Sequence, residues 1–239
     1  RQDSVHGSFK GTIRVLNESD TMVVNGNTIQ VIYANKPEDV DYSEYKINEP
    51  LIIDNTGIWT DRKNLERHLS TGAKKVLLTA PAGGDIPNIV YGVNHHQITA
   101  QQDVISAASC TTNAIVPVLK TLLDQYGIHH GHVETVHAYT NDQNLIDNYH
   151  PGDRRGRSAA LNMVLTSTGA AKAVAKVIPE LEGRLTGNAI RVPTPNVSMA
   201  ILNLQLNQSV TRDGLNEFLR HMALHSEYQE QIGYTVSTE

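Results

Sequence analysis

Short apolar runs alternate with a helical segment in the first half of the chain, and this alternation limits the fold more than any other feature. Residues 51–54 and 75–79 have the composition of buried strands, and residues 61–71 between them carry leucines at helical spacing. Two further runs of the same type follow at 89–91 and 104–106. Buried strands separated by a helix are typical of a parallel sheet. We therefore expect a largely parallel α/β sheet over residues 1–109.

The second half has a different pattern. Helical spacing continues from Cys110 to about residue 125, and a last helix starts near Thr211, which has the side chain of an N-cap. These segments predict a second, α+β domain over residues 110–239 with a mixed, largely antiparallel sheet. A strand–turn–strand unit is expected near the N-terminus, at 22–24 and 28–33. The other strands and the other helix of the second half are expected at 133–136, 190–192, 198–206 and 169–177.

Composition excludes several classes of protein. The chain of 239 residues is 39% hydrophobic and 19% charged, with a formal net charge of −5, so no basic surface for nucleic acid is indicated. No apolar run approaches the roughly 18 residues of a membrane span. A single cysteine cannot form an intrachain disulfide, which favours a reducing, cytoplasmic location. Because the chain begins with Arg1 rather than Met, we expect it to be an internal portion of a longer polypeptide.

The single cysteine, Cys110, falls where a predicted strand gives way to a predicted helix. The N-terminus of a helix stabilises a thiolate through its free N–H groups and its dipole. A buried cysteine with a packing role is about as common, but such a residue usually has apolar neighbours. The hydroxyl-bearing neighbours Ser109 and Thr111 therefore favour a nucleophile.

Two later residues fit that chemistry. His137 ends a predicted strand, and an imidazole near a thiol can take its proton; the alternative is an ordinary surface histidine. Arg191 lies inside a short apolar strand, where an unpaired cation is costly, so it needs an anion as a partner.

A long polar stretch, residues 138–162, separates these two residues, and irregular segments of this length are usually functional. It contains a basic cluster at 153–157 that is either solvated or binds phosphate. Thr168 and Gly169 then open a helix, which is either simply capped by Thr168 or carries a phosphate over its N-terminus. The remaining histidine groups have no organised acidic or cysteine partners, so no metal site is predicted.

Four ordered segments resemble signatures of the glyceraldehyde-3-phosphate dehydrogenase family. They are Ala-Ser-Cys-Thr-Thr-Asn at 108–113, Thr-Val-His-Ala-Tyr-Thr-Asn-Asp-Gln at 135–143, Ser-Thr-Gly-Ala-Ala-Lys-Ala-Val at 167–174 and Arg-Val-Pro-Thr-Pro-Asn-Val-Ser at 191–198. The resemblance runs nearly end to end. It implies an incomplete Rossmann-type NAD(P)-binding domain over residues 1–109 and a C-terminally incomplete catalytic domain over residues 110–239.

The resemblance also implies a role for each matching residue. Cys110 would form a hemithioacetal and then a thioester with glyceraldehyde 3-phosphate, His137 would act as the base, and inorganic phosphate would release 1,3-bisphosphoglycerate. The substrate phosphate would bind Thr140, Asp142, Arg155 and Arg191, and the attacking phosphate Ser109, Thr111, Thr168 and Gly169. The dinucleotide would contact Asn55, Thr56, Gly57, Thr79 and Asn141. A homotetramer is implied, with residues 138–162 packed against a neighbouring subunit.

Some residues depart from the family pattern. No G-x-G-x-x-G fingerprint occurs in the 239 residues, so we expect NAD with NADP as the alternative, and weak cofactor binding by this chain alone. Asn148-Tyr149 replaces a Leu-Pro pair common in NAD-selective members and resembles the erythrose-4-phosphate dehydrogenase branch. Two alternatives therefore stay open: erythrose-4-phosphate dehydrogenase, and a truncated, non-catalytic paralogue with a binding role.

Overall fold

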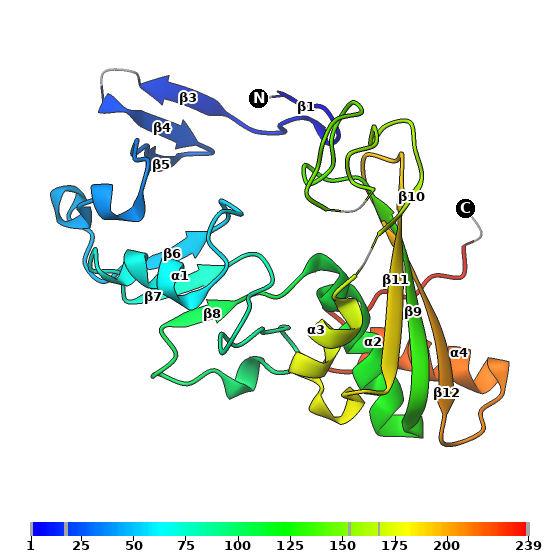
Figure 1. Cartoon of the computed structure of the whole chain (residues 1–239). Helices are drawn as coiled ribbons and strands as arrows, with labels where there is room; N and C mark the ends of the chain where they lie inside the picture. The colour runs from blue at the N-terminus through cyan, green and yellow to red at the C-terminus, as the bar shows by residue number, and fades with distance from the viewer. Residues whose placement is uncertain (1, 17–18, 153, 167, 238–239) are drawn as a thin grey trace.

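The chain builds two larger sheets with helices between them and a small antiparallel region at the N-terminus (Figure 1). The computed structural model describes residues 2–16, 19–152, 154–166 and 168–237. No helix within these ranges is long and apolar enough to cross a membrane.

The first larger sheet is parallel, as the alternation predicts. It contains β6 (Leu51–Asp54), β7 (Lys75–Leu78) and β8 (Val104–Ser106) in that order. Helix α1 (Arg62–Leu69) forms the crossover from β6 to β7, and its N-cap Asp61 accepts a hydrogen bond of 3.1 Å from the Asn64 amide. Their buried core comprises Leu65, Val76, Leu78, Ala82, Ile86 and Val104.

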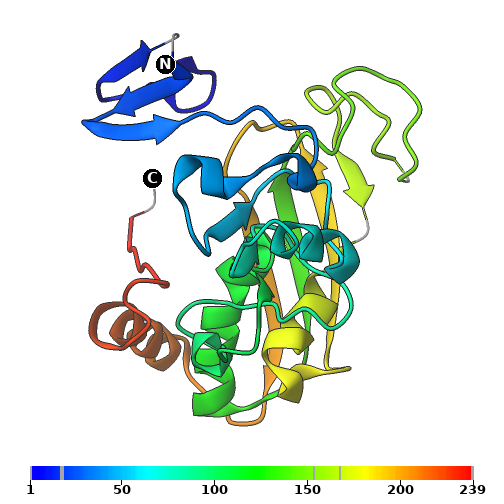
Figure 2. The same ribbon diagram turned by 90° about the vertical axis from the view of Figure 1, so that its left-hand side faces the viewer.

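The N-terminal region is antiparallel, so the largely parallel sheet expected over residues 1–109 is parallel only in β6, β7 and β8. The turn at Asn25 and Gly26, with φ of 50° and 86°, reverses the chain in the predicted hairpin. Strands joined by so short a turn can pair only antiparallel. Figure 2 shows this region standing apart from the larger sheets. Its strands are β1 (Gln2–Asp3), β2 (Gly7–Ser8), β3 (Ile13–Leu16), β4 (Thr21–Val24) and β5 (Asn27–Gln30).

The strand expected at 89–91 does not form. Only an isolated bridge between Asn88 and Ser106 is present beside β8. Pro87 has no N–H to continue a ladder, and the amide of Val90 donates instead to the Asn94 side chain at 2.7 Å. The segment therefore ends its pairing with β8 after one bridge.

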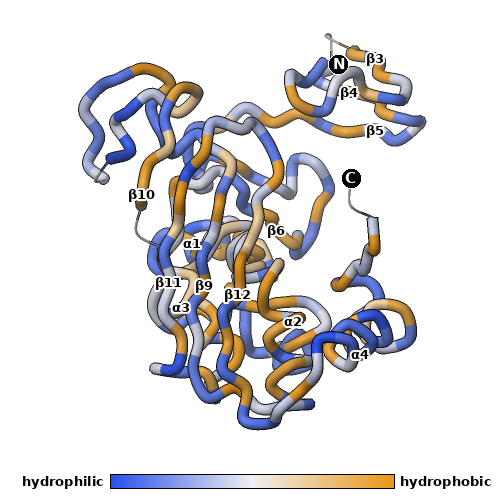
Figure 3. The backbone as a smooth tube through the Cα atoms, turned by 90° about the vertical axis from the view of Figure 1, so that its right-hand side faces the viewer, coloured by the Kyte–Doolittle hydropathy of each residue, from blue (hydrophilic) through white to orange (hydrophobic). Residues whose placement is uncertain are grey.

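The second larger sheet is mixed, as expected, with the order β10-β11-β9-β12. Its strands β9 (Ile128–Ala138) and β11 (Leu185–Val192) run parallel, whereas β10 (Val164–Thr166) and β12 (Met199–Leu206) pair antiparallel at the two edges. Figure 3 shows the sheet with α2 and α3 behind it. The helices of this half are α2 (Cys110–Tyr126), α3 (Ala170–Val177) and α4 (Arg212–His225). The short 3-10 helices of the chain are η2 (Pro37–Asp39), η3 (Tyr42–Tyr45), η4 (His95–Gln97) and η5 (Pro179–Leu181).

The main hydrophobic core lies between the mixed sheet and α2 and α3, with Ile115, Leu119 and Val133 fully enclosed. Val90 and Val93 from the first half also pack in this core. The boundary between residues 109 and 110 therefore stays a prediction, because side chains from both sides of it share one core. The sharing couples the end of the parallel sheet to the start of α2.

Residues 139–152 and 154–163 form the long irregular segment that was expected. Backbone hydrogen bonds across the segment join the Asn144 amide to the Arg155 carbonyl at 3.1 Å and the Asn148 amide to the Gly156 carbonyl at 2.9 Å. The Ser158 amide donates to the Asp147 carboxylate at 2.8 Å. These contacts give the segment a defined course without a helix or a strand.

Candidate active site

Cys110 is the first residue of α2, directly after the N-cap Ser109. The Ser109 hydroxyl accepts a hydrogen bond of 3.0 Å from the Thr112 amide, so the helix starts at a fixed residue. The thiol is exposed to solvent, close to the unpaired N–H groups and the positive end of the helix dipole. This position stabilises negative charge on sulfur or on an oxygen bound next to it.

A constrained turn carries the chain from β8 into α2. Ala108 has a φ of +59°, an uncommon value for a residue with a Cβ. The Ser106 hydroxyl accepts from the Ala108 amide at 3.0 Å and donates to the Ala80 carbonyl at 2.6 Å. These contacts fix the direction in which the nucleophile leaves the parallel sheet. This turn could not be predicted from the sequence, because no local pattern indicates an alanine in the left-handed conformation.

His137 lies next to Cys110, with its Nε2 atom 3.6 Å from the cysteine Sγ. Its other nitrogen, Nδ1, lies 2.6 Å from the Ala138 carbonyl oxygen and 2.9 Å from NH1 of Arg191. His137 on β9 and Arg191 on β11 are direct partners in the parallel register, so these side chains are neighbours. The sheet thus brings together two residues that lie 54 positions apart.

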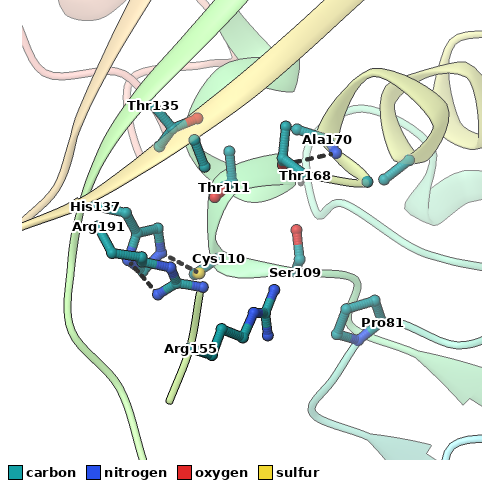
Figure 4. Close-up of a pocket in the computed structure, with 13 residues that line it drawn as sticks. Pro81, Ser109, Cys110, Thr111, Thr135, His137, Arg155, Thr168, Ala170 and Arg191 are labelled. Atoms are coloured by element: carbon teal, nitrogen blue, oxygen red, sulfur yellow. Dashed lines mark hydrogen bonds between the residues drawn. The ribbon is translucent and has the colours of Figure 1, made fainter. Parts of the chain in front are cut away.

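One cavity of about 250 Å³ opens beside this pair (Figure 4). It receives two guanidinium groups, those of Arg155 and Arg191. Burial and the charge of Arg155 lower the pKa of Arg191, while Asp142 and Cys110 oppose this. The buried Nε of Arg191 has no partner among the described residues. Two facing cations and a free donor favour an anion in this cavity. Its lining comprises Pro81, Ser109, Cys110, Thr111, Thr135, His137, Arg155, Thr168, Gly169, Ala170, Ala173, Ala189 and Arg191.

The start of α3 contributes to the same cavity, although Thr168 does not occupy the N-cap position as expected. Gly169 is the N-cap, and the Thr168 hydroxyl, one residue earlier, accepts from the Ala170 amide at 3.1 Å. A Cβ at Gly169 would meet nothing within 4 Å, so there is room for a ligand at this end of the helix. Ser167, in the same motif, lies outside the described residues.

Thr140 and Asp142 reach the site from the long irregular segment. NH1 of Arg191 donates to the Thr140 hydroxyl at 3.4 Å, and Arg155 forms an ion pair with Asp142. Thr140 also lines a second hollow of about 420 Å³ that shares Cys110 and His137 with the first cavity. Seven of the eight predicted phosphate-binding residues therefore line the two hollows beside the sulfur, and the eighth, Asp142, is paired with Arg155.

The predicted cofactor residues lie elsewhere, mostly at the carboxyl ends of β6 and β7. Gly57 has a φ of +71°, and the Asp54 carboxylate accepts from the Thr56 amide at 2.9 Å. The Thr79 hydroxyl donates to the Asp54 carbonyl at 3.2 Å. Ligands of parallel sheets bind at the carboxyl ends of the strands, and β8 leads from this edge to Cys110. The open turn at 55–57 therefore fits one end of a dinucleotide; Asn141 is exposed in the irregular segment.

Two features of the site were not predicted from the sequence. Thr135 lines both hollows, and its buried hydroxyl has no partner among the described residues. Thr135 lies two residues before His137 on β9, and side chains two apart on a strand point to the same face. Its place in the site could therefore have been inferred from the position of His137. The buried Asp54 is the second feature, since its carboxylate lies 3.1 Å from Nε2 of His68 on α1. The described residues contain no group of three or more histidine, cysteine or acidic side chains arranged to hold a metal ion.

Comparison with known proteins agrees with this arrangement. Residues 1–62 match the model of the glyceraldehyde 3-phosphate dehydrogenase NAD binding domain, and residues 109–238 match the model of the C-terminal domain. A glyceraldehyde-3-phosphate dehydrogenase-like protein of Pseudomonas aeruginosa is 62% identical over all of this chain and 52% of the relative. Glyceraldehyde-3-phosphate dehydrogenase 1 of Bacillus subtilis is 44% identical, over 98% of this chain and 68% of the relative. Glyceraldehyde-3-phosphate dehydrogenase of Zymomonas mobilis is 42% identical, over 98% of this chain and 69% of the relative.

The matched models describe an NAD binding domain and a C-terminal domain, so the chain has the two-domain architecture of a nicotinamide-dependent dehydrogenase. The chain belongs to the glyceraldehyde-3-phosphate dehydrogenase family. The chain spans about half the length of the Pseudomonas relative and about two thirds of the length of the other two.

Proposed function

We propose that this chain carries the catalytic centre of a phosphorylating, NAD-dependent glyceraldehyde-3-phosphate dehydrogenase. The observation that supports this most strongly is the Cys110 sulfur at the start of α2, 3.6 Å from Nε2 of His137 and beside two arginines. A nucleophile, a base and a cationic pocket are the groups that covalent oxidation of a phosphorylated aldehyde requires.

In the first half of the reaction, the Cys110 thiolate attacks the aldehyde carbon and forms a C–S bond, and the carbonyl oxygen becomes an oxyanion. The backbone N–H groups at the start of α2 and the His137 side chain stabilise that oxyanion. His137, protonated when it took the proton of the Cys110 thiol, gives that proton to the oxyanion to form the hemithioacetal hydroxyl, and takes it back as the C–H bond breaks. NAD, held by residues at the carboxyl ends of β6 and β7, would supply the hydride acceptor, and a thioester would then remain on Cys110.

In the second half, inorganic phosphate attacks the thioester carbon. The C–S bond breaks, an acyl phosphate leaves, and the Cys110 thiolate is restored. Arg155 and Arg191 hold the substrate phosphate with Thr140 and Asp142. The attacking phosphate lies against Ser109, Thr111, Thr168 and Gly169, near the starts of α2 and α3.

The oligomeric state, the location and the choice of cofactor belong to the same proposal. We infer a homotetramer in the cytoplasm, with NADP as the alternative cofactor. Large apolar side chains of the irregular segment are 74% to 85% exposed, which supports a subunit contact there; they are Leu145, Ile146, Tyr149 and Leu161.

The proposal is tested by following reduced cofactor with glyceraldehyde 3-phosphate, phosphate and either NAD or NADP. Cys110→Ser is expected to abolish oxidation, because serine is a far weaker nucleophile at neutral pH. Ser226→Ala at the end of α4, far from Cys110 in the fold, is a control that keeps the activity of the native chain. A Cys110→Ser variant with most of the native rate would contradict the mechanism. A higher kcat/KM for erythrose 4-phosphate in the same assay would reassign the substrate.

A further inference from the structure

The Nδ1 atom of His137 has two polar neighbours with opposite requirements. The Ala138 carbonyl oxygen, at 2.6 Å, can only accept a hydrogen bond, so it requires a proton on Nδ1. NH1 of Arg191, at 2.9 Å, can only donate, so it requires a lone pair on Nδ1. One nitrogen cannot meet both requirements at the same time.

The position of Arg191 decides between them. NH1 also lies 3.2 Å from the Ala138 carbonyl oxygen, so the guanidinium bridges this oxygen and Nδ1. A fixed positive charge at 2.9 Å opposes a proton on Nδ1. The single proton of the neutral ring is then on Nε2, which faces the Cys110 sulfur.

The two tautomers of His137 differ in whether Nε2 can act as a base toward Cys110. With its proton on Nε2, the ring can donate to a Cys110 thiolate but has no lone pair there to accept a proton. With its proton on Nδ1, the ring donates to the Ala138 carbonyl, and Nε2 is free to act as a base toward Cys110. The second state is the one that proton abstraction needs.

We propose that Arg191 is a positioning residue that determines which nitrogen of the neutral His137 ring carries the proton. A phosphate monoester in the cavity moves this proton from Nε2 to Nδ1 by drawing NH1 of Arg191 away from Nδ1. The inference rests on the proposed function, because it uses the same cavity. Among the described residues, the charged and titratable groups around His137 are Cys110 from α2, Arg191 from β11, and Arg155 and Asp142 from the irregular segment.

Arg191 is suited to this double role because its other contacts are weak. Its NH1 contact with the Thr140 hydroxyl is long, at 3.4 Å, and its buried Nε has no partner among the described residues. Asp142, the carboxylate whose charge acts on Arg191, is already paired with Arg155. A phosphate oxygen therefore offers Arg191 a stronger, charge-assisted partner than any it has among the described residues. Accepting that partner releases His137.

Arg155→Met is a matched control for Arg191→Met. Both arginines line the same cavity, and each substitution removes one positive charge, but only Arg191 contacts Nδ1. An effect of general pocket charge would appear in both variants, whereas the proposed contact is lost in one.

The test is nitrogen-15 NMR of the chain labelled in its histidine rings, which identifies the protonated nitrogen directly. The His137 signals are assigned by their loss in His137→Asn, and glycerol 3-phosphate serves as the probe because it has the phosphate but no aldehyde. We expect Nε2 to carry the proton without the probe and Nδ1 to become protonated with it. Arg191→Met should have Nδ1 protonated without the probe, whereas Arg155→Met without the probe should match the native chain, with the proton on Nε2.

A proton on Nδ1 in the native chain without the probe would overturn the inference, as would identical His137 signals in the native chain and Arg191→Met. If Arg191→Met fails to fold, the titration of the native chain decides, and His137 signals that do not respond to the probe overturn the switch. The proposed oxidation is tested separately, by the activity of Cys110→Ser. The imidazole signals do not measure this activity, so the failure of one proposal can be told apart from the failure of the other.

Discussion

At the scale of single residues, the site gathers buried polar atoms that lack partners among the described residues. The Thr135 hydroxyl is one of them, in a residue only 2% exposed between two strands of the mixed sheet. Its position beside Cys110 and Thr168 indicates that burial here serves the ligand rather than the fold. An unsatisfied buried hydroxyl destabilises a protein by about 1–3 kcal/mol.

Replacing Thr135 by valine should therefore raise the free energy of unfolding by about 1 kcal/mol, because the shape is kept and the unpaired hydroxyl is removed. Urea unfolding at neutral pH measures this. Thr112→Val is the matched control: its hydroxyl lies 2.7 Å from the Ser109 hydroxyl, so its loss should lower stability. Equal destabilisation of both variants would show that Thr135 has a structural partner.

At the scale of elements, an exposed ion pair joins α1 to the 3-10 helix η2. Arg67 contacts Glu38, with NH2 2.7 Å from the carboxylate, and its guanidinium lies 5.3 Å from the Trp59 ring centre. The hydrogen bond from Arg67 lowers the pKa of Glu38 to about 2. The folded state thus favours the ionised carboxylate more than the unfolded state does.

The lowered pKa of Glu38 determines how the stability of the chain changes with pH. Because the pKa of Glu38 is lower in the folded chain, its contribution to stability is complete above about pH 4.5 and is lost as pH falls toward about 2. Glu38→Gln should therefore be less stable than the native chain at pH 6 and nearly equal to it at pH 2.5, as measured by urea unfolding. Glu44→Gln, on η3, controls for the loss of a surface carboxylate. A pH-independent difference between native and Glu38→Gln would contradict the assigned cause.

Elements were predictable from the sequence where one local pattern determines them. Periodicity located α1, α2, α3 and α4 and the strands of both larger sheets except β10, which was not expected. Each located element buries one apolar face or run. Periodicity failed at 89–91, where an apolar run pairs once and then loses its amide to the Asn94 side chain. It also could not place the two guanidinium groups in one cavity, since that depends on the parallel register of β9 and β11 and on the course of residues 139–163.

At the scale of the whole molecule, the two sheets meet at Cys110. The parallel sheet delivers the cysteine through β8 and the Ala108 turn, and the mixed sheet delivers His137 and Arg191 from its inner strands. The family resemblance stated from four short motifs is confirmed by both domain matches. The roles of the individual residues stay predictions, because identity of fold does not by itself establish chemistry.

The central claim is that His137 and the start of α2 activate Cys110, and alkylation of this thiol by iodoacetamide tests it most directly. Since the chain has one cysteine, every modified site is Cys110. Free cysteine has a pKa of about 8.5 and reacts slowly at pH 7. We predict that the native chain reacts at least about tenfold faster than the urea-unfolded chain at pH 7, and that His137→Asn loses most of this advantage while His132→Asn, on the same strand, keeps it. Equal rates for the native and unfolded chains, or for the native chain and His137→Asn, would contradict the account.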